Sequence, residues 1–101
     1  MFHRTPSGFM LDFPNGWTAS VQYGPGNYCT NQYQNRNPFG ESVQFLESTT
    51  AEIAAWITDE RTSTTTRGWH KFEDGQDVKG WQSVNSVMEF LNMVSQLESN
   101  N

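Results

Sequence analysis

The chain has 101 residues, and its six basic and eleven acidic side chains give it a net charge of −5. This length allows one domain with one hydrophobic core, and it leaves the formation of a homo-oligomer open. The acidic balance argues against duplex nucleic acid as a direct partner, since phosphate binding needs clustered Lys and Arg. A single cysteine excludes an intrachain disulfide, and neither a signal peptide nor a membrane-spanning run is visible. We therefore expect a cytoplasmic protein without membrane contact.

The clearest local signal is a hairpin between residues 9 and 23, with residues 1–7 before it as a short leader into the first strand. A two-residue loop, Asn15-Gly16, would place Phe13 opposite Thr18 and divide the large apolar side chains between both faces of the sheet. A three-residue loop that begins at Pro14 keeps them on one face and suits the turn chemistry of Pro and Gly. The sequence therefore favours the three-residue loop, which predicts the cross-strand pairs Phe13–Trp17, Leu11–Ala19 and Phe9–Val21.

A long loop is predicted for residues 24–41, which are rich in Gly, Pro, Asn and Gln and show no periodicity. Loops longer than about 12–15 residues in a small domain are usually functional or disordered. Glycines here could free backbone N–H groups for an anion, tyrosines could stack on a planar ring, and an arginine could pair with a phosphate. The alternative is an ordered loop whose tyrosines only fasten it to the sheet. The predicted ligand-binding residues are Tyr23, Gly24, Gly26, Asn27, Tyr28, Tyr33 and Arg36.

Two further strands are expected, at residues 42–47 and 50–58. Residues 42–47 form the first of them. Residues 50–58 could form either a helix or a strand. A capping box that begins at Thr49 allows a helix. As a strand, the segment would place small and branched apolar side chains on one face and Trp56 on the other. The flanking Ser/Thr runs are typical of hairpin loops, so the strand is favoured. The polar run of residues 61–67 is then a turn.

A second hairpin and a helix are predicted for the last third of the chain. Residues 68–82 carry Asp74-Gly75 at the expected hairpin tip. Ser83 is a good N-cap, and residues 84–97 have apolar side chains at helical spacing that would cover one face of the sheet. The helical stripe consists of Val87, Phe90, Leu91, Val94 and Leu97, widened by Met88 and Met93.

Taken together, these elements predict a single α+β domain over residues 1–101. An antiparallel β-sheet of five or six short strands within residues 8–82 would pack against one C-terminal amphipathic helix.

Three tryptophans offer a second kind of binding surface. Trp is enriched at interface hot spots, so an aromatic surface could bind a protein partner. The same side chains could equally fill the core of a small sheet. Pairing of Trp69 with Trp81 across the second hairpin would leave at least one of them exposed. The predicted partner-binding residues are Trp56, Trp69 and Trp81.

No catalytic residue, metal site or cofactor is predicted. The Gly-Pro-Gly sequence lacks the GK[ST] ending of a P-loop. Cys29 could act as a nucleophile with His70 or His3 as its base, but a single cysteine is more often a small buried apolar side chain. The isolated Cys and His residues lack the paired spacing of a zinc site. The acidic cluster around Gly75 lacks the spacing of a calcium loop and is expected to be a solvated tip.

Three stretches, FPNGWTASVQYGPGNYC, TAEIAAW and DGQDVKGWQSVNSVMEFLNMV, resemble a group of small uncharacterised bacteriophage proteins. The similarity covers most of residues 9–97 and centres on a VQ(F/Y)GxGNYC segment. It implies an accessory protein made in the host cytoplasm during infection, where such proteins often neutralise host defences. The resemblance assigns no activity and no site residues.

We therefore expect a non-enzymatic protein that binds and sequesters a small ligand, with a nucleotide signal as the leading candidate. The alternative is an inhibitor that binds a host or defence protein through an aromatic surface or a sheet edge.

Overall fold

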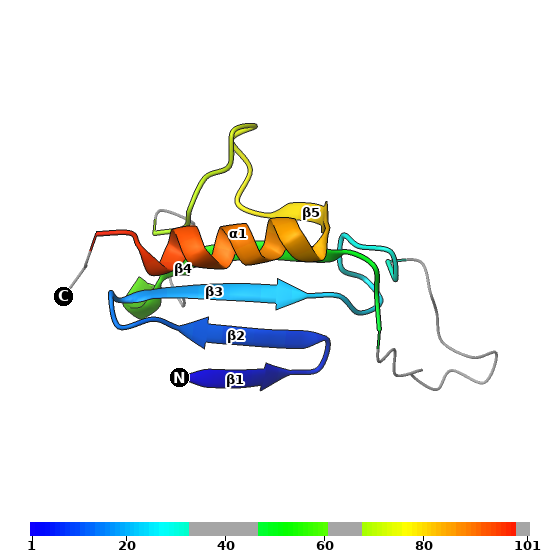
Figure 1. Cartoon of the computed structure of the whole chain (residues 1–101), viewed down its shortest axis with the longest axis horizontal. Coiled ribbons are helices and arrows are strands. Elements are labelled where there is room, and N and C mark those ends of the chain that lie inside the picture. Colours follow the sequence, from blue (N-terminus) through cyan, green and yellow to red (C-terminus); the bar gives the residue numbers. More distant parts are fainter. Residues whose placement is uncertain (33–46, 61–67, 99–101) are drawn as a thin grey trace.

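The computed structural model describes residues 1–32, 47–60 and 68–98. Within these ranges, five antiparallel strands form one sheet in the order in which they occur along the chain (Figure 1). A single described helix follows the last strand, so the predicted α+β architecture is confirmed. The elements are β1 (Phe2–Thr5), β2 (Gly8–Asp12), β3 (Trp17–Gln22), β4 (Ala51–Ile57), a 3-10 turn η1 (Thr58–Glu60), β5 (Lys79–Gln82) and α1 (Val84–Ser95).

The β2–β3 hairpin has the register that the apolar pattern predicts. Phe9 lies opposite Val21 and Leu11 opposite Ala19. The N–H of Phe13 donates to the carbonyl of Trp17 at 2.8 Å, which closes a three-residue loop. Gly16 has a φ of 86°, in the left-handed region that favours glycine. The three-residue loop is therefore confirmed.

The interpretation of residues 1–7 as a leader is wrong, because β1 pairs with β2 along its whole length. The pairs run from Phe2–Leu11 to Thr5–Gly8, and Pro6-Ser7 forms the connecting turn. β1 is an edge strand with one large apolar side chain, so it lacks the alternation by which a half-buried strand is recognised. A first hairpin thus precedes the one that the sequence marks most clearly.

Residues 50–58 form the predicted strand rather than a helix. β4 pairs with β3 along its length, from Trp17–Ile57 to Gln22–Glu52. Its alternate residues belong to the cores on the two faces of the sheet, as the alternation indicates. The strand predicted for residues 42–47 lies outside the described residues, except for Glu47, which belongs to no strand. The turn predicted for residues 61–67 also lies outside them.

The predicted hairpin of residues 68–82 is confirmed only at its tip, where the N–H of Phe72 donates to the carbonyl of Gln76 at 3.0 Å; its arms do not pair with each other as strands. Its two arms bind the outer edge of β4: Trp69 forms a bridge with Trp56, and β5 pairs with the first half of β4. The loop between the arms rises away from the sheet and turns at Gly75, whose φ is 81° (Figure 1). Because β4 is buried, its outer N–H and C=O groups need partners, which a local hairpin between the arms would not supply.

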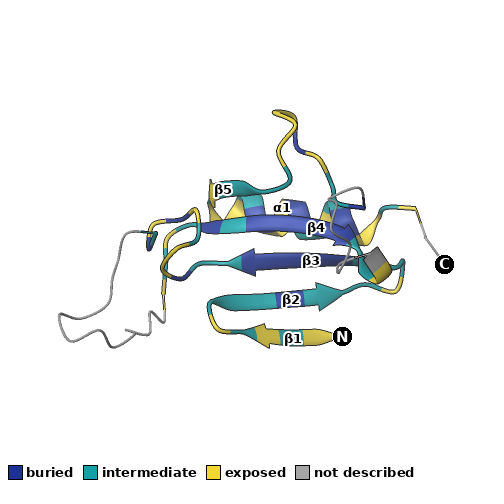
Figure 2. Ribbon diagram, turned by 180° about the vertical axis from the view of Figure 1, so that it is seen from behind, coloured by how far each residue is buried: buried dark blue, intermediate teal, exposed yellow. Residues whose placement is uncertain are grey.

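α1 packs across one face of the sheet, where it contacts β3, β4 and β5; we call this face the helix side. Ser83 caps it as predicted, accepting a hydrogen bond from the N–H of Ser86 at 3.2 Å, and the helix ends at Ser95, two residues before the predicted end. Burial concentrates in β3, β4 and the inner face of α1, whereas β1 is largely exposed (Figure 2). The buried side chains on this face are Ala19, Val21, Ala51, Ile53, Ala55, Phe72, Val87, Phe90 and Val94.

Candidate functional site

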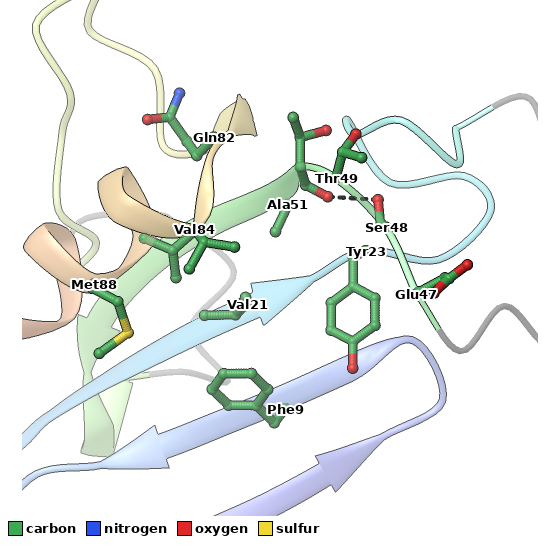
Figure 3. Close-up of a pocket in the computed structure, with 12 residues that line it drawn as sticks. Phe9, Val21, Tyr23, Glu47, Ser48, Thr49, Ala51, Gln82, Val84 and Met88 are labelled. Carbon is green, nitrogen blue, oxygen red and sulfur yellow. Dashed lines mark hydrogen bonds between the residues drawn. The ribbon is translucent and has the colours of Figure 1, made fainter.

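A pocket of about 330 Å³ lies on the helix side of the sheet, beside the first turns of α1 (Figure 3). Its base consists of Phe9 from β2, Val21 from β3 and Ala51 from β4. The hairpin register explains this base, because the cross-strand pair Phe9–Val21 points to the face on which α1 packs. The helix supplies a second apolar wall, made of Val84, Val87 and Met88.

Polar side chains surround this apolar base. Tyr23 follows β3, residues 47–50 lead into β4, and Gln82 ends β5. Their hydroxyl and amide groups can both donate and accept hydrogen bonds. Among the described residues that line the pocket, Glu47 is the only one that carries a formal charge. The lining therefore suits a mainly apolar ligand that is neutral or cationic and has a hydrogen-bonding edge.

The loop after β3 supports the polar side of the pocket. Asn31 is buried, and its side-chain amide donates to the carbonyls of Tyr23 at 2.8 Å and Glu47 at 3.0 Å. The N–H of Thr30 donates to Oγ1 of Thr50 at 2.8 Å. These bonds connect the end of β3 to the segment that enters β4. Part of the loop predicted to bind a ligand thus positions residues that line the pocket.

The two glycines marked for anion binding use their backbone N–H groups inside the loop. Gly24 donates to Oδ1 of Asn27 at 3.0 Å, and Gly26 donates to the carbonyl of Gln32 at 3.1 Å. Gly26 has a φ of 87°, which explains the glycine at that position. Because these donors are already used, the structure does not support the expectation that they would hold an anion.

The structure places the two described tyrosines of the predicted site on different surfaces. Tyr23 lines the pocket, whereas Tyr28 lies outside it and packs against Trp81. Tyr33 and Arg36 fall outside the described residues. Of the two described tyrosines that the sequence offers for stacking, Tyr23 therefore lines the pocket and Tyr28 does not.

The predicted aromatic surface also divides into two parts. Trp56 is buried and stacks on Trp69, with ring centroids 4.8 Å apart, on the sheet face opposite α1. Trp81 is 56% exposed and stacks on Tyr28 instead of pairing with Trp69. Trp56 and Trp69 thus serve mainly as core, and Trp81 alone of the three is largely open to solvent.

Several pocket residues were not singled out by sequence reasoning. Phe9 was assigned to the core, and Met88 only to the margin of the helical stripe. Val84 and Met88 are exposed and lie one helical turn apart, outside the buried positions of α1. Exposed apolar side chains beside the buried stripe of an amphipathic helix are the signal that could have indicated a pocket here.

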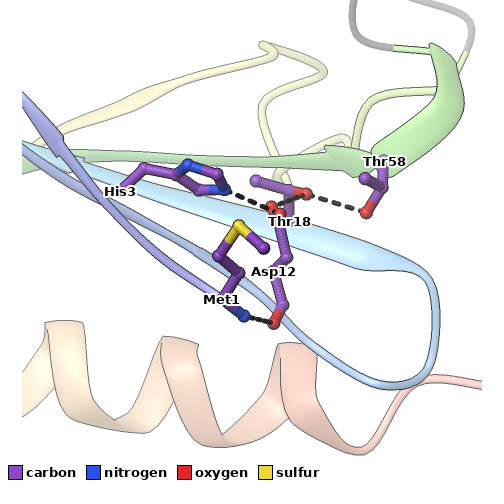
Figure 4. Close-up of polar contacts among 5 residues, drawn as sticks. All are labelled: Met1, His3, Asp12, Thr18 and Thr58. Carbon is purple, nitrogen blue, oxygen red and sulfur yellow. Dashed lines mark hydrogen bonds and ion pairs between the residues drawn. The ribbon is translucent and has the colours of Figure 1, made fainter.

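A chain of polar contacts lies on the opposite face of the sheet (Figure 4). His3 Nε2 is 2.7 Å from Asp12 Oδ2, and the Thr18 hydroxyl donates to Asp12 Oδ1 at 2.8 Å. Thr18 Oγ1 is also 2.8 Å from Thr58 Oγ1. The hydrogen bond from His3 is the main cause that holds the pKa of Asp12 below its ordinary value of 3.8; Thr18 adds to it, and burial opposes it.

This polar chain does not have the arrangement of a nucleophilic triad. In a triad the imidazole lies between the hydroxyl and the carboxylate, so that it can take the hydroxyl proton. Here the Asp12 carboxylate lies between His3 and Thr18, and the hydroxyl donates to the carboxylate. The contacts therefore fasten β1, β2 and β3 together without activating a nucleophile.

Cys29 has no catalytic surroundings among its described contacts. The side chain is buried, and its thiol donates to the carbonyl of Gly24 at 3.6 Å. His70 lies against Phe72 and Phe90, at centroid distances of 4.8 and 6.0 Å, and burial lowers its pKa. The described residues contain no group of three side chains that could hold a metal ion. They also include no helix long and apolar enough to cross a membrane.

Comparisons of the chain with protein-family models, curated protein sequences and solved structures found no match. The similarity to small bacteriophage proteins thus stays a resemblance of sequence pattern. The pocket and the exposed aromatic pair must be interpreted from their own chemistry.

Proposed function

We propose that this chain is a non-enzymatic binding protein that holds a small, mainly apolar ligand in the pocket between α1 and the sheet. The observation that carries the proposal is a concave space of about 330 Å³ with an apolar base and a polar margin. Small-molecule sites typically measure about 300–1,000 Å³ and combine an apolar lining with a few polar groups that orient the ligand. The pocket lies at the small end of that range, which suits a ligand about the size of one or two fused rings.

The charge of the lining selects among ligands. Glu47 is negative, and no Lys or Arg is present among the described lining residues. A phosphate or carboxylate placed here would be repelled by Glu47 and would find no cation among the described lining residues to replace its hydration. An aromatic amine or a neutral nucleoside therefore fits better than a nucleotide, the ligand that the sequence first suggested.

Thermal unfolding in the presence of matched ligands tests this proposal. The panel pairs each nucleoside with its monophosphate and each aromatic amine with the corresponding acid. A ligand at 100 times its Kd adds about 2.7 kcal/mol to the free energy of unfolding, which gives a clear rise in Tm. We expect the neutral or cationic member of a pair to stabilise the chain more than its anionic counterpart.

Two variants of α1 show where the ligand binds. Met88→Gln removes an exposed apolar side chain from the pocket wall, and Glu89→Gln changes an exposed neighbour that does not line the pocket. We expect Met88→Gln to weaken the ligand-induced rise in Tm and Glu89→Gln to leave it unchanged. The proposal fails if no compound stabilises the chain, or if both variants respond as the unmodified chain does. A phosphate-dependent rise that Arg36→Ala abolishes would contradict the preference for a neutral or cationic ligand and would favour the nucleotide that the sequence predicts.

A second candidate function is binding of a protein partner by strand addition at β1. This edge strand carries Phe2, which is 88% exposed. Met1 and Asp12 exchange hydrogen bonds of 2.8 and 2.9 Å, so by antiparallel alternation the backbone groups of Phe2 and Arg4 point away from β2. Within the described residues no strand pairs with this edge, and an edge of this kind can accept a partner strand. The anti-defence role implied by the phage resemblance is compatible with either candidate.

Two substitutions at one position test strand addition. Arg4→Pro removes an outward N–H without disturbing the β1–β2 bonds, whereas Arg4→Thr keeps that N–H. This candidate is supported if a host protein binds the unmodified chain and Arg4→Thr but does not bind Arg4→Pro. Equal retention by both variants contradicts it.

A further inference from the structure

Two aromatic side chains that are distant in sequence form an exposed pair outside the pocket. Tyr28 is 46% exposed and Trp81 is 56% exposed, and their ring centroids lie 5.7 Å apart at an interplanar angle of 30°. The N–H of Trp81 donates to the carbonyl of Tyr28 at 2.8 Å. The two rings are therefore held together by the backbone as well as by their own contact.

The backbone at Trp81 is held in an unfavourable conformation. Its φ is 53°, and it is the only described non-glycine residue with a positive φ. It lies in a β-bulge: Lys79 pairs with Ile53 and Gln82 with Ala51, so Gly80 and Trp81 together face a single β4 residue. Bulges redirect side chains, and strained residues of this kind concentrate at binding sites.

Gly80 allows this arrangement because it has no side chain. A Cβ atom at this position would lie 2.5 Å from Cβ of Tyr28 and 2.7 Å from the Tyr28 carbonyl oxygen. The backbone of β5 can therefore approach Tyr28 closely enough to bring the two rings together.

A carboxylate lies beside the aromatic pair. Glu52 is the β4 residue opposite the bulge, and its Oε2 accepts a hydrogen bond from the N–H of Tyr28 at 2.9 Å. No ion pair joins Glu52 to a cation within the described part of the chain. A carboxylate without a described counter-ion, beside two exposed rings in a protein of net charge −5, is complementary to a cation.

We propose that Tyr28, Trp81 and Glu52 form a docking site for an arginine side chain of a partner protein. A guanidinium is planar, stacks on aromatic faces and pairs with a carboxylate through its N–H groups. An ammonium group is a compact, strongly hydrated charge and would use the ring faces less well. The site is separate from the pocket, so the proposal does not depend on the small-ligand function.

Titration with three short peptides tests the recognition of arginine. The peptides are acetyl-Gly-Arg-Gly-Arg-Gly-amide, the same sequence with lysine, and the same sequence with citrulline, which has the shape of arginine without its charge. The readout is the NMR signal of the Trp81 indole N–H, assigned by its absence in Trp81→Asn. We expect the arginine peptide to shift this signal, the lysine peptide to bind about three- to tenfold more weakly, and the citrulline peptide to have no effect.

Two variants separate binding from a structural role. Glu52→Gln keeps an oxygen for the N–H of Tyr28 but removes the charge, and Glu89→Gln is the matched control on α1. We expect Glu52→Gln to weaken arginine binding about threefold or more and to reduce its salt dependence, with no change for Glu89→Gln. Trp81→Asn should abolish binding with an equal or higher Tm, because Asn accepts a positive φ more readily.

Several outcomes would overturn the proposal. These are equal binding of the citrulline or lysine peptide, no binding of the arginine peptide, and unchanged affinity in Glu52→Gln. A large loss of Tm in Trp81→Asn would also overturn it, since Trp81 would then serve the stability of the fold. Measurement of Tm and affinity on the same samples distinguishes these cases.

Discussion

The side-chain amide of Asn15 donates hydrogen bonds to the carbonyl oxygens of Val94, at 2.8 Å, and Leu97, at 3.2 Å. The turn of the β2–β3 hairpin is thereby joined to the C-terminal end of α1. In the same turn, Oδ1 of Asn15 accepts from the N–H of Trp17 at 3.1 Å. The last carbonyls of a helix lack their regular helical partners, and Asn15 adds a donor to that of Val94, which also accepts from the N–H of Leu97 at 3.2 Å; Leu97 itself follows the helix. Asn15 holds α1 against the sheet at the end away from the pocket.

Replacement of Asn15 by alanine should destabilise the chain. Asn15→Ala leaves the carbonyls of Val94 and Leu97 without this partner, and we expect a loss of about 1–3 kcal/mol in the free energy of unfolding. Urea denaturation monitored by circular dichroism measures it. Asn85→Ala, at an exposed position of the same helix, is the control and should change the free energy by less than about 0.5 kcal/mol. Equal effects in the two variants would show that the Asn15 bonds contribute little.

Two valines on α1 provide a matched test of burial. Val94 is fully buried against the sheet, whereas Val84 is largely exposed. Val94→Ala should cost about 1–3 kcal/mol through lost burial and the cavity that remains. Val84→Ala should stay within about 0.5 kcal/mol, because it removes little buried surface. Thermal unfolding compares the Tm of the two variants, and a similar fall in both would contradict the observed packing of α1.

The close approach of β5 to Tyr28 predicts that Gly80 does not tolerate a side chain. Gly80→Ala should push β5 away from Tyr28, with a loss of about 1–3 kcal/mol and a weaker contact between the two rings. In Gly75→Ala the new side chain meets open space, so the only cost is the φ of 81°, about 1 kcal/mol in the free energy of unfolding. Ring-to-ring NOEs between Tyr28 and Trp81 should weaken in Gly80→Ala and persist in Gly75→Ala. Unchanged NOEs in both variants would argue against the observed approach.

The polar chain around Asp12 predicts a pH-dependent contribution to stability. The pKa of Asp12 is lowered in the folded chain, chiefly by the hydrogen bond from His3, so this contribution is complete above the ordinary value of 3.8. It is lost as the pH falls through the lower folded pKa. The difference in unfolding free energy between the unmodified chain and Asp12→Asn should therefore be largest near neutral pH and shrink below about pH 4.

His3→Gln provides a second test of the same polar chain. It removes the largest cause of the lowered pKa of Asp12, so it should weaken the acid dependence while the carboxyl group remains. Urea titrations at several pH values measure the effect for both variants. An acid dependence of His3→Gln equal to that of the unmodified chain would contradict the assigned role of His3, and a difference between the unmodified chain and Asp12→Asn that does not vary with pH would contradict that of Asp12.

The candidate sites were only partly predictable from sequence. The sequence predicts Tyr23 and Tyr28 as rings for stacking on a ligand and Trp81 as a contact for a protein partner, whereas the structure places Tyr23 in the pocket and Tyr28 beside Trp81. The pocket depends on Phe9 and Met88, which sequence reasoning treated as core. A pocket arises where packing is incomplete, and no local pattern records how far a helix covers a sheet.

The β2–β3 register, the strand at β4 and the N-cap of α1 could each be predicted from local sequence. Each of these follows from local turn chemistry or from a periodic apolar pattern, and the structure confirms all three. The strand within residues 1–7 follows from the tertiary structure, and so does the pairing of both arms of residues 68–82 with β4 beyond the hydrogen-bonded tip at Phe72 and Gln76. The tertiary structure also brought Trp81 to Tyr28. The reason is that backbone hydrogen bonds do not depend on side-chain identity, so which free edge a segment joins is settled only once the sheet exists.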